Sequence, residues 1–129
     1  KVKNDTGSID LPIGRHITQR KKMGTGGDHS RSACTYYEVL QRSKNWSYLK
    51  LRPETGRTHQ IRVHLASLHH PVLGDKLYGG KNLNSGTLNM DRQALHASHL
   101  ELNHPVSGAS LSFSAKLPID MESFLQSHK

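Results

Sequence analysis

Residues 55–66 read TGRTHQIRVHLA, and this stretch decides how the fold is organised. Upstream runs are rich in β-forming residues, but from this segment onward the apolar residues follow a helical spacing. Ile61, Leu65 and Leu68 recur at intervals of four and three residues and form one stripe. The sequence therefore predicts one central helix over about 58–69, directly after a glycine turn.

Strands are predicted on both sides of this helix. Residues 32–42 and 46–51 are two β-forming runs joined by a short turn, which favours an antiparallel hairpin. The run 9–13 alternates in polarity but contains Pro12, so we expect it at the edge of a sheet.

After the helix we expect a polar loop over 79–92, a third strand near 95–102 and a fourth over 111–115. Asp120 is expected to cap a short last helix, whose inward-facing residues would be Met121, Phe124 and Leu125. The predicted fold class is α+β, with a mostly antiparallel mixed sheet, one central helix and a short C-terminal helix.

Basic residues are concentrated in the first half of the 129-residue chain. The net charge is +8, from 18 Lys and Arg against 10 Asp and Glu, and residues 1–62 carry all of the excess. This distribution favours a surface that faces a polyanion such as nucleic acid, although a merely solvated basic surface would give the same totals.

Several other classes are excluded by composition. No apolar run reaches six residues, so we expect neither a membrane-spanning helix nor a signal peptide. The single cysteine, Cys34, excludes an internal disulfide framework and suits a reducing cytosol. The ten histidines show no i, i+4 pair of the kind that binds zinc in a helix, and no Gly-x-Ser-x-Gly segment indicates a hydrolase.

The start of the central helix is crowded with hydrogen-bond donors. Free N–H groups and the positive end of the helix dipole lie there, and Arg57, His59 and Arg62 add to them, which indicates an anion-binding corner. Arg62 lies on the flank of the apolar stripe, where a partly buried guanidinium needs an acid or a phosphate as its partner. No acid stands at helical spacing and the nearest downstream is Asp75, so the partner is distant in the sequence or missing from the chain.

Between residues 10 and 118 the chain resembles the C-terminal half of the catalytic domain of the RluA family of RNA pseudouridine synthases. The resemblance is carried by four motifs in order: 55–66, then HPVLGD with Tyr78 and Gly79 over 70–79, RQALHA over 92–97, and His104-Pro105 with Gly108. The strand over 33–40 also matches. We therefore interpret residues 1–129 as a single, partial pseudouridine synthase catalytic domain.

The resemblance implies an activity without cofactor or metal. Members of the family break the N1–C1′ bond of a uridine in RNA, turn the uracil and join its C5 to C1′. An Asp performs the key step; Arg62 matches the arginine that pairs with this Asp, and Ile61 matches the apolar residue that packs near the base. The target nucleotide must leave its stack to be reached.

One departure from the family pattern is large. The reacting Asp lies upstream in the family, in an Arg-Leu-Asp context, and none of the Asp residues of this chain follows Arg-Leu. We therefore expect the chain alone to be inactive, with Arg62 unpaired or bound to solvent, a buffer anion or a surrogate acid. A smaller departure is His69, where the family usually has Gly.

RNA is the partner that this interpretation predicts, with ribosomal RNA of the large subunit as the first expectation and transfer RNA as the second, in the cytoplasm and without membrane contact. The alternative is a noncatalytic RNA-binding module. The oligomeric state is not readable from the sequence. The expected RNA contacts are Arg15, Arg20, Lys21, Lys22, Lys50, Arg52, Arg57 and His59.

Overall fold

The computed structural model describes residues 2–79 and 88–129, and the side chain of residue 28 is not described. The chain forms two compact units, Lys1–Gln93 and Ala94–Lys129. Helices and antiparallel strands occur together, so the predicted α+β class is confirmed. The assignment of residues 1–129 to a single domain stays a prediction.

The main sheet of the first unit has three antiparallel strands in the order β1-β5-β6, built from Thr6–Asp10, Cys34–Arg42 and Ser47–Pro53. β5 and β6 form the predicted hairpin, and β1 lies at the edge of the sheet. The run 9–13, predicted as one edge strand, is divided: Ile9 and Asp10 end β1, whereas Ile13 begins the central strand of the next sheet. Alternation gives the sheet two faces. Thr35 on β5 is buried, whereas its neighbour Tyr36 is exposed on the opposite face.

A second, small sheet follows β1 in the order β3-β2-β4, with β2 at Ile13–Arg15, β3 at Met23–Thr25 and β4 at Asp28–Arg31. The sequence pattern predicted no strand over residues 14–31. The stretch is rich in glycine and positive charge, and its strands have only three or four residues. Strands this short do not show the alternation of apolar and polar residues by which a strand is predicted.

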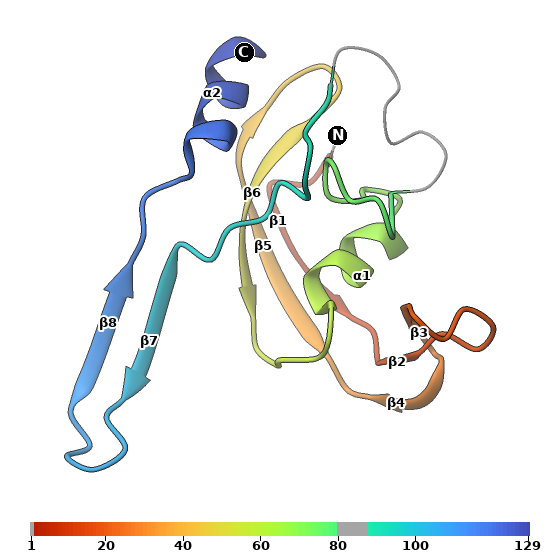
Figure 1. Cartoon of the computed structure of the whole chain (residues 1–129), viewed down its shortest axis with the longest axis vertical. Coiled ribbons are helices and arrows are strands. Elements are labelled where there is room, and N and C mark those ends of the chain that lie inside the picture. The colour runs from red at the N-terminus through yellow and green to blue at the C-terminus, as the bar shows by residue number, and fades with distance from the viewer. Residues whose placement is uncertain (1, 80–87) are drawn as a thin grey trace. The chain divides into compact units, whose positions relative to one another are not determined.

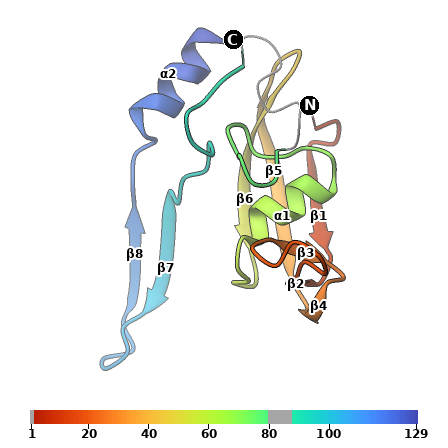
Figure 2. The same cartoon turned by 45° about the vertical axis from the view of Figure 1, so that its right-hand side comes forward.

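The helix α1, Gln60–Ser67, lies across the β1-β5-β6 sheet in both views of the molecule (Figures 1 and 2). Val63 of α1 packs with Ile13 and Ala33 in a buried cluster, and Met23 and Tyr78 pack against this cluster. This cluster therefore packs α1 against the small sheet and fixes the helix beside its basic residues.

The buried face of α1 differs from the predicted stripe. Leu65 is buried, but Ile61 is half-buried and Leu68 is exposed, while the polar side chains of Gln60 and His64 are buried instead. Hydrophobic spacing did not reveal this face because its polar members are satisfied by hydrogen bonds rather than by apolar contact.

The second unit contains the hairpin β7-β8, His99–Asn103 paired with Ser110–Ser114, and the helix α2, Ile119–Ser127. The two late strands and the last helix are thus confirmed. The predicted cap is wrong, because Pro118 is the N-cap and Asp120 lies inside the first turn. Met121, Phe124 and Leu125 are half-buried. Most of the polar loop predicted over 79–92 lies outside the described residues.

Candidate catalytic and RNA-contact site

The turn that leads into α1 is held by one buried amide. The Gln60 side chain accepts hydrogen bonds from the Thr55 hydroxyl and the Arg57 N–H, and donates to the carbonyl of Cys34 and the hydroxyl of Thr35. All four hydrogen-bonding positions of the amide are therefore used. Gln60 fixes the turn to strand β5, so the residues of this turn have a defined position relative to the sheet.

Next to Gln60, a directional chain of hydrogen bonds anchors the helix. The Nε2 atom of His64 lies 2.8 Å from the carbonyl oxygen of Leu11, so Nε2 carries the hydrogen. The other ring nitrogen, Nδ1, lies 2.8 Å from the Thr35 hydroxyl and accepts from it. His64 and Thr35 have no exposed surface. This network fixes the rotation of α1 about its axis and thereby the direction of Arg62.

Arg62 forms a bidentate ion pair with the carboxylate of Asp75. Its Nε donates to Oδ2 of Asp75 and its Nη2 donates to Oδ1, both at 2.8 Å. The Asp75 carboxylate is fully buried and also accepts the N–H groups of Leu77 and Tyr78. A bidentate pair of this kind fixes the plane of the guanidinium.

The pairing shifts the pKa of both partners. Burial alone would raise the pKa of Asp75, but the hydrogen bonds from Arg62 and from the N–H of Tyr78 outweigh burial, so the pKa of Asp75 lies below its usual value. The hydrogen bond to Asp75 raises the pKa of Arg62. Both groups therefore carry their full charge at neutral pH.

This geometry corrects one expectation from the sequence. We expected the carboxylate partner of Arg62 to be missing from the chain, and within that expectation named a surrogate acid as one outcome. Asp75 is such an acid, 13 residues away. Spacing along the helix did not reveal it, because the turn after α1 folds back and brings Asp75 against Arg62.

A tyrosine and a histidine complete the surroundings of Arg62. The guanidinium carbon of Arg62 lies 5.0 Å from the ring centre of Tyr78, a cation–π distance. The Tyr78 hydroxyl accepts the N–H of Met23 and lies 2.8 Å from Nδ1 of His59. Burial, and then the charge of Arg62, lower the pKa of His59, so its imidazole is neutral at pH 7.

The predicted anion-binding corner is divided between two places. His59 and Arg62 contact Tyr78 and Asp75, whereas Arg57 donates from Nε to the carbonyl of Ser32 and lines a hollow beside the small sheet. Arg15 and Arg20 line the same hollow. The sequence placed these three arginines among its RNA contacts, and the structure brings them together.

The other predicted contacts lie elsewhere. Lys50 and Arg52 are on the exposed face of the β1-β5-β6 sheet, where Lys50 is opposite Glu38 and Arg52 lies over Tyr36 at 5.0 Å. Lys21 is exposed near the small sheet, and Lys22 lies 5.8 Å from the ring centre of Tyr78. The predicted RNA contacts therefore occupy two faces of the first unit. Ile61 is half-buried on α1.

Over residues 2–79 and 88–129, no three His, Cys, Asp or Glu side chains are grouped so as to hold a metal ion. In the same residues no helix combines the length and the apolar character that crossing a bilayer requires.

Comparison with known proteins points to one family. The sequence model described as RNA pseudouridylate synthase matches residues 1–67, a span that ends with α1. The ribosomal large subunit pseudouridine synthase D of Vibrio cholerae is 48% identical over 126 residues, which cover 89% of this chain and 38% of the relative. The protein of the same name from Haemophilus ducreyi is 42% identical over 132 residues, which cover 95% of this chain and 40% of the relative.

Two solved structures share the fold. Human RNA pseudouridylate synthase domain containing 1 superposes with a TM-score of 0.77 at 25% identity, over 98% of this chain and 60% of that one. Human RNA pseudouridylate synthase domain containing 4 superposes with a TM-score of 0.71 at 28% identity, over 95% of this chain and 56% of that one. The chain thus spans about two fifths of the curated relatives and more than half of each solved structure.

Proposed function

The chain belongs to the RNA pseudouridylate synthase family, and from this premise we propose that it supplies the Arg62 part of an active site that converts uridine to pseudouridine in RNA of the large ribosomal subunit. The curated relatives carry that substrate in their names. We place the activity in the cytoplasm, where ribosomal RNA is found; transfer RNA is the second candidate substrate.

The geometry of Arg62, inside the matched residues, is the observation that carries the proposal. A guanidinium has five N–H donors, and Asp75 takes two of them. Among the described residues, none accepts a hydrogen bond from the remaining three. Arg62 can therefore bind a second carboxylate while Asp75 holds it in place.

A second carboxylate bound there would be stabilised in its charged form. The positive charge of Arg62 keeps a neighbouring Asp ionised, and the fixed guanidinium plane orients it. To act as a nucleophile or as a base at the ribose, the Asp must be ionised and correctly oriented. The resemblance places this Asp in an Arg-Leu-Asp context, and the 129 residues contain no such triplet. The pairing of Arg62 with that Asp is part of the proposal, as is the place of Ile61 near the base.

The proposal is tested by supplying the carboxylate. The 129-residue chain is compared with a fusion in which the part of the Vibrio cholerae relative that precedes its matched region is joined to the chain. Release of tritium from large-subunit RNA labelled at C5 of uridine is measured, because the C5 hydrogen is lost when C5 joins C1′. We expect no turnover from the chain alone and robust turnover from the fusion.

Two results would contradict the proposal. Robust turnover by the chain alone would show that the reacting group lies within these 129 residues. A folded fusion that binds the RNA tightly but releases no tritium would favour the alternative function, a noncatalytic RNA-binding module.

A further inference from the structure

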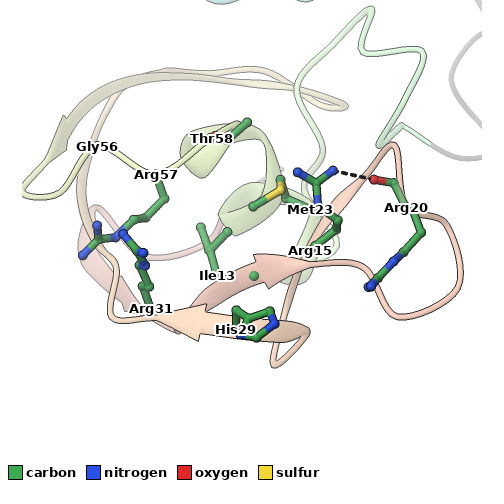
Figure 3. A pocket seen from close by; sticks show the side chains of 10 residues that line it. Ile13, Arg15, Arg20, Met23, His29, Arg31, Gly56, Arg57 and Thr58 are labelled. Atoms are coloured by element: carbon green, nitrogen blue, oxygen red, sulfur yellow. Dashed lines mark hydrogen bonds between the residues drawn. The ribbon is translucent and has the colours of Figure 1, made fainter.

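The hollow beside the small sheet has features of a binding site in its own right. Its volume is about 450 Å³, and it opens between the β3-β2-β4 sheet and the turn before α1 (Figure 3). This volume lies in the range of about 300–1,000 Å³ that is usual for sites of small ligands. Arg62 is not among the residues that line it, so the hollow is distinct from the Arg62–Asp75 pair.

The lining of the hollow is strongly basic. It includes Arg15, Arg20, Arg31 and Arg57, together with His29. None of the described side chains that line it is acidic. In Figure 3 the side chains of Arg31 and Arg57 extend toward the same end of the hollow. Positive groups that converge in this way repel one another and attract an anion to the space between them.

The side chains of Arg15 and Arg57 form hydrogen bonds that position them without removing their charge. Nη1 of Arg15 donates to the carbonyl of Arg20, and Nε of Arg57 donates to the carbonyl of Ser32. A backbone carbonyl is neutral, so both guanidinium groups keep their positive charge and further N–H donors. The flat fork of a guanidinium matches the oxygens of a phosphate group.

We propose that this hollow binds a backbone phosphate of the RNA substrate next to the nucleotide that reacts, with Arg31 as a direct contact. This inference rests on the proposed function and adds to it a second subsite. The half-buried Met23 and the buried Ile13 give one wall an apolar character against which the attached nucleoside can lie. The phosphate would then fix the register of the RNA relative to Arg62.

Arg31 is the most informative residue to change. It lies on the short strand β4, is exposed and pairs through its backbone with Ile13. Arg15 and Arg57, in contrast, also hold the backbone. Arg31→Gln removes one charge from the hollow and leaves those contacts in place. Lys44→Gln, in the exposed turn between β5 and β6, removes the same charge outside the hollow and is the matched control.

The experiment measures affinity of the full chain for a fluorescent single-stranded oligouridylate between about 50 and 200 mM KCl. For Arg31→Gln we expect the slope of log K against log salt to fall by about 0.7, and the affinity to fall about five-fold at about 0.1 M salt. Arg31→Lys should retain most of the slope, and Lys44→Gln should leave it unchanged. Circular dichroism checks that each variant is folded.

A second measurement needs no variant. Inorganic phosphate is titrated into the unsubstituted chain while the Nε–H signals of its arginines are followed by NMR. Arg31 and Arg57 should shift more than Arg42, which is paired with Asp5. Equal shifts for all arginines would overturn the proposal, as would an unchanged slope for Arg31→Gln, an equal loss for Lys44→Gln, or no RNA binding by the chain.

These readouts are independent of turnover. If the fusion described above releases no tritium while Arg31→Gln still lowers the salt slope, the enzymatic proposal fails and the phosphate subsite stands. If the fusion is active and Arg31→Gln behaves as the unsubstituted chain does, the subsite fails and the enzymatic proposal stands.

Discussion

A single ion pair connects the fold to the proposed chemistry. Arg62 is held by the buried Asp75, and Asp75 is held in turn by two backbone N–H groups of the turn that follows it. The sequence identified Arg62 as a residue in need of an acid. It did not identify Asp75 as that acid, because their contact depends on a turn whose shape local spacing does not encode.

Replacing Asp75 by Asn should therefore be costly. Asp75→Asn leaves a largely buried guanidinium without its counter-charge, and we expect the free energy of unfolding to fall by about 3 kcal/mol at pH 7, the lower end of the range for breaking a buried pair. Asp10→Asn, at an exposed position of β1, is the control and should change it by less than about 0.5 kcal/mol. Urea denaturation measures both.

The pH dependence of this difference follows from the lowered pKa of Asp75. Folding stabilises the ionised form of Asp75, so ionised Asp75 contributes to the free energy of unfolding. This contribution is complete above the pKa of about 3.9 that Asp has in the unfolded chain. It is lost as the pH falls below about 3.9 toward the lower pKa of Asp75 in the folded protein. The difference in free energy of unfolding between the unsubstituted chain and Asp75→Asn should thus be constant from pH 5 to 7, to within about 0.5 kcal/mol, and should become smaller in stronger acid. A constant difference down to about pH 2 would contradict the pairing.

His69 offers a separate test at the scale of one residue. Its φ is 62°, in the left-handed region that glycine adopts without strain but other residues rarely adopt. The turn after α1 therefore contains a histidine in a strained backbone conformation. This conformation costs a non-glycine residue about 1–2 kcal/mol.

His69→Gly should relieve that strain. After the extra flexibility of glycine in the unfolded chain is subtracted, we expect a gain of about 0.5–1 kcal/mol in the free energy of unfolding. Ala66→Gly, inside α1 with ordinary helical geometry, should instead lose about 1 kcal/mol. Thermal melts of the three proteins decide the matter; a His69→Gly variant that melts below the unsubstituted chain would show that the turn is held in another way.

At the scale of elements, the sequence predicted what depends on local pattern and missed what depends on polar contacts. The β5-β6 hairpin followed from its β-forming residues, and the helix was found within two residues at each end. α1 begins and ends inside the predicted 58–69 because His59, before it, and His69, after it, are left-handed. Hydropathy gives no signal for a buried face made of Gln60 and His64.

That polar face predicts the effect of a nearly isosteric change. Thr35→Val removes the hydroxyl that joins Gln60 to His64. It leaves Nδ1 of His64 and one of the two side-chain N–H groups of Gln60 buried without a partner. We expect a loss of about 1–3 kcal/mol in the free energy of unfolding. Thr25→Val, at an exposed position of β3, is the matched control and should be nearly neutral. Equal stability of the two variants would mean that the network does not hold α1.

At the scale of the whole molecule, charge and family point to the same partner. The excess of positive charge over residues 1–62 predicted a polyanion, and four arginines of that region line one hollow beside α1. The sequence proposed Arg15, Arg20 and Arg57 but not Arg31 and His29. No local pattern marks these two as members of the group, because only the pairing of β4 with β2 brings them to the hollow.

The most direct test of the account compares Arg62→Lys with the unsubstituted sequence in the fusion that supplies the upstream carboxylate. Lysine keeps the positive charge but cannot bind Asp75 through two parallel N–H groups and a second carboxylate as well. We predict that tritium release falls by at least about 100-fold, the scale of losing one fixed charged donor, while the affinity for RNA stays within about two-fold. Turnover of the lysine variant at the unsubstituted rate would contradict the claim that Arg62 organises the active site.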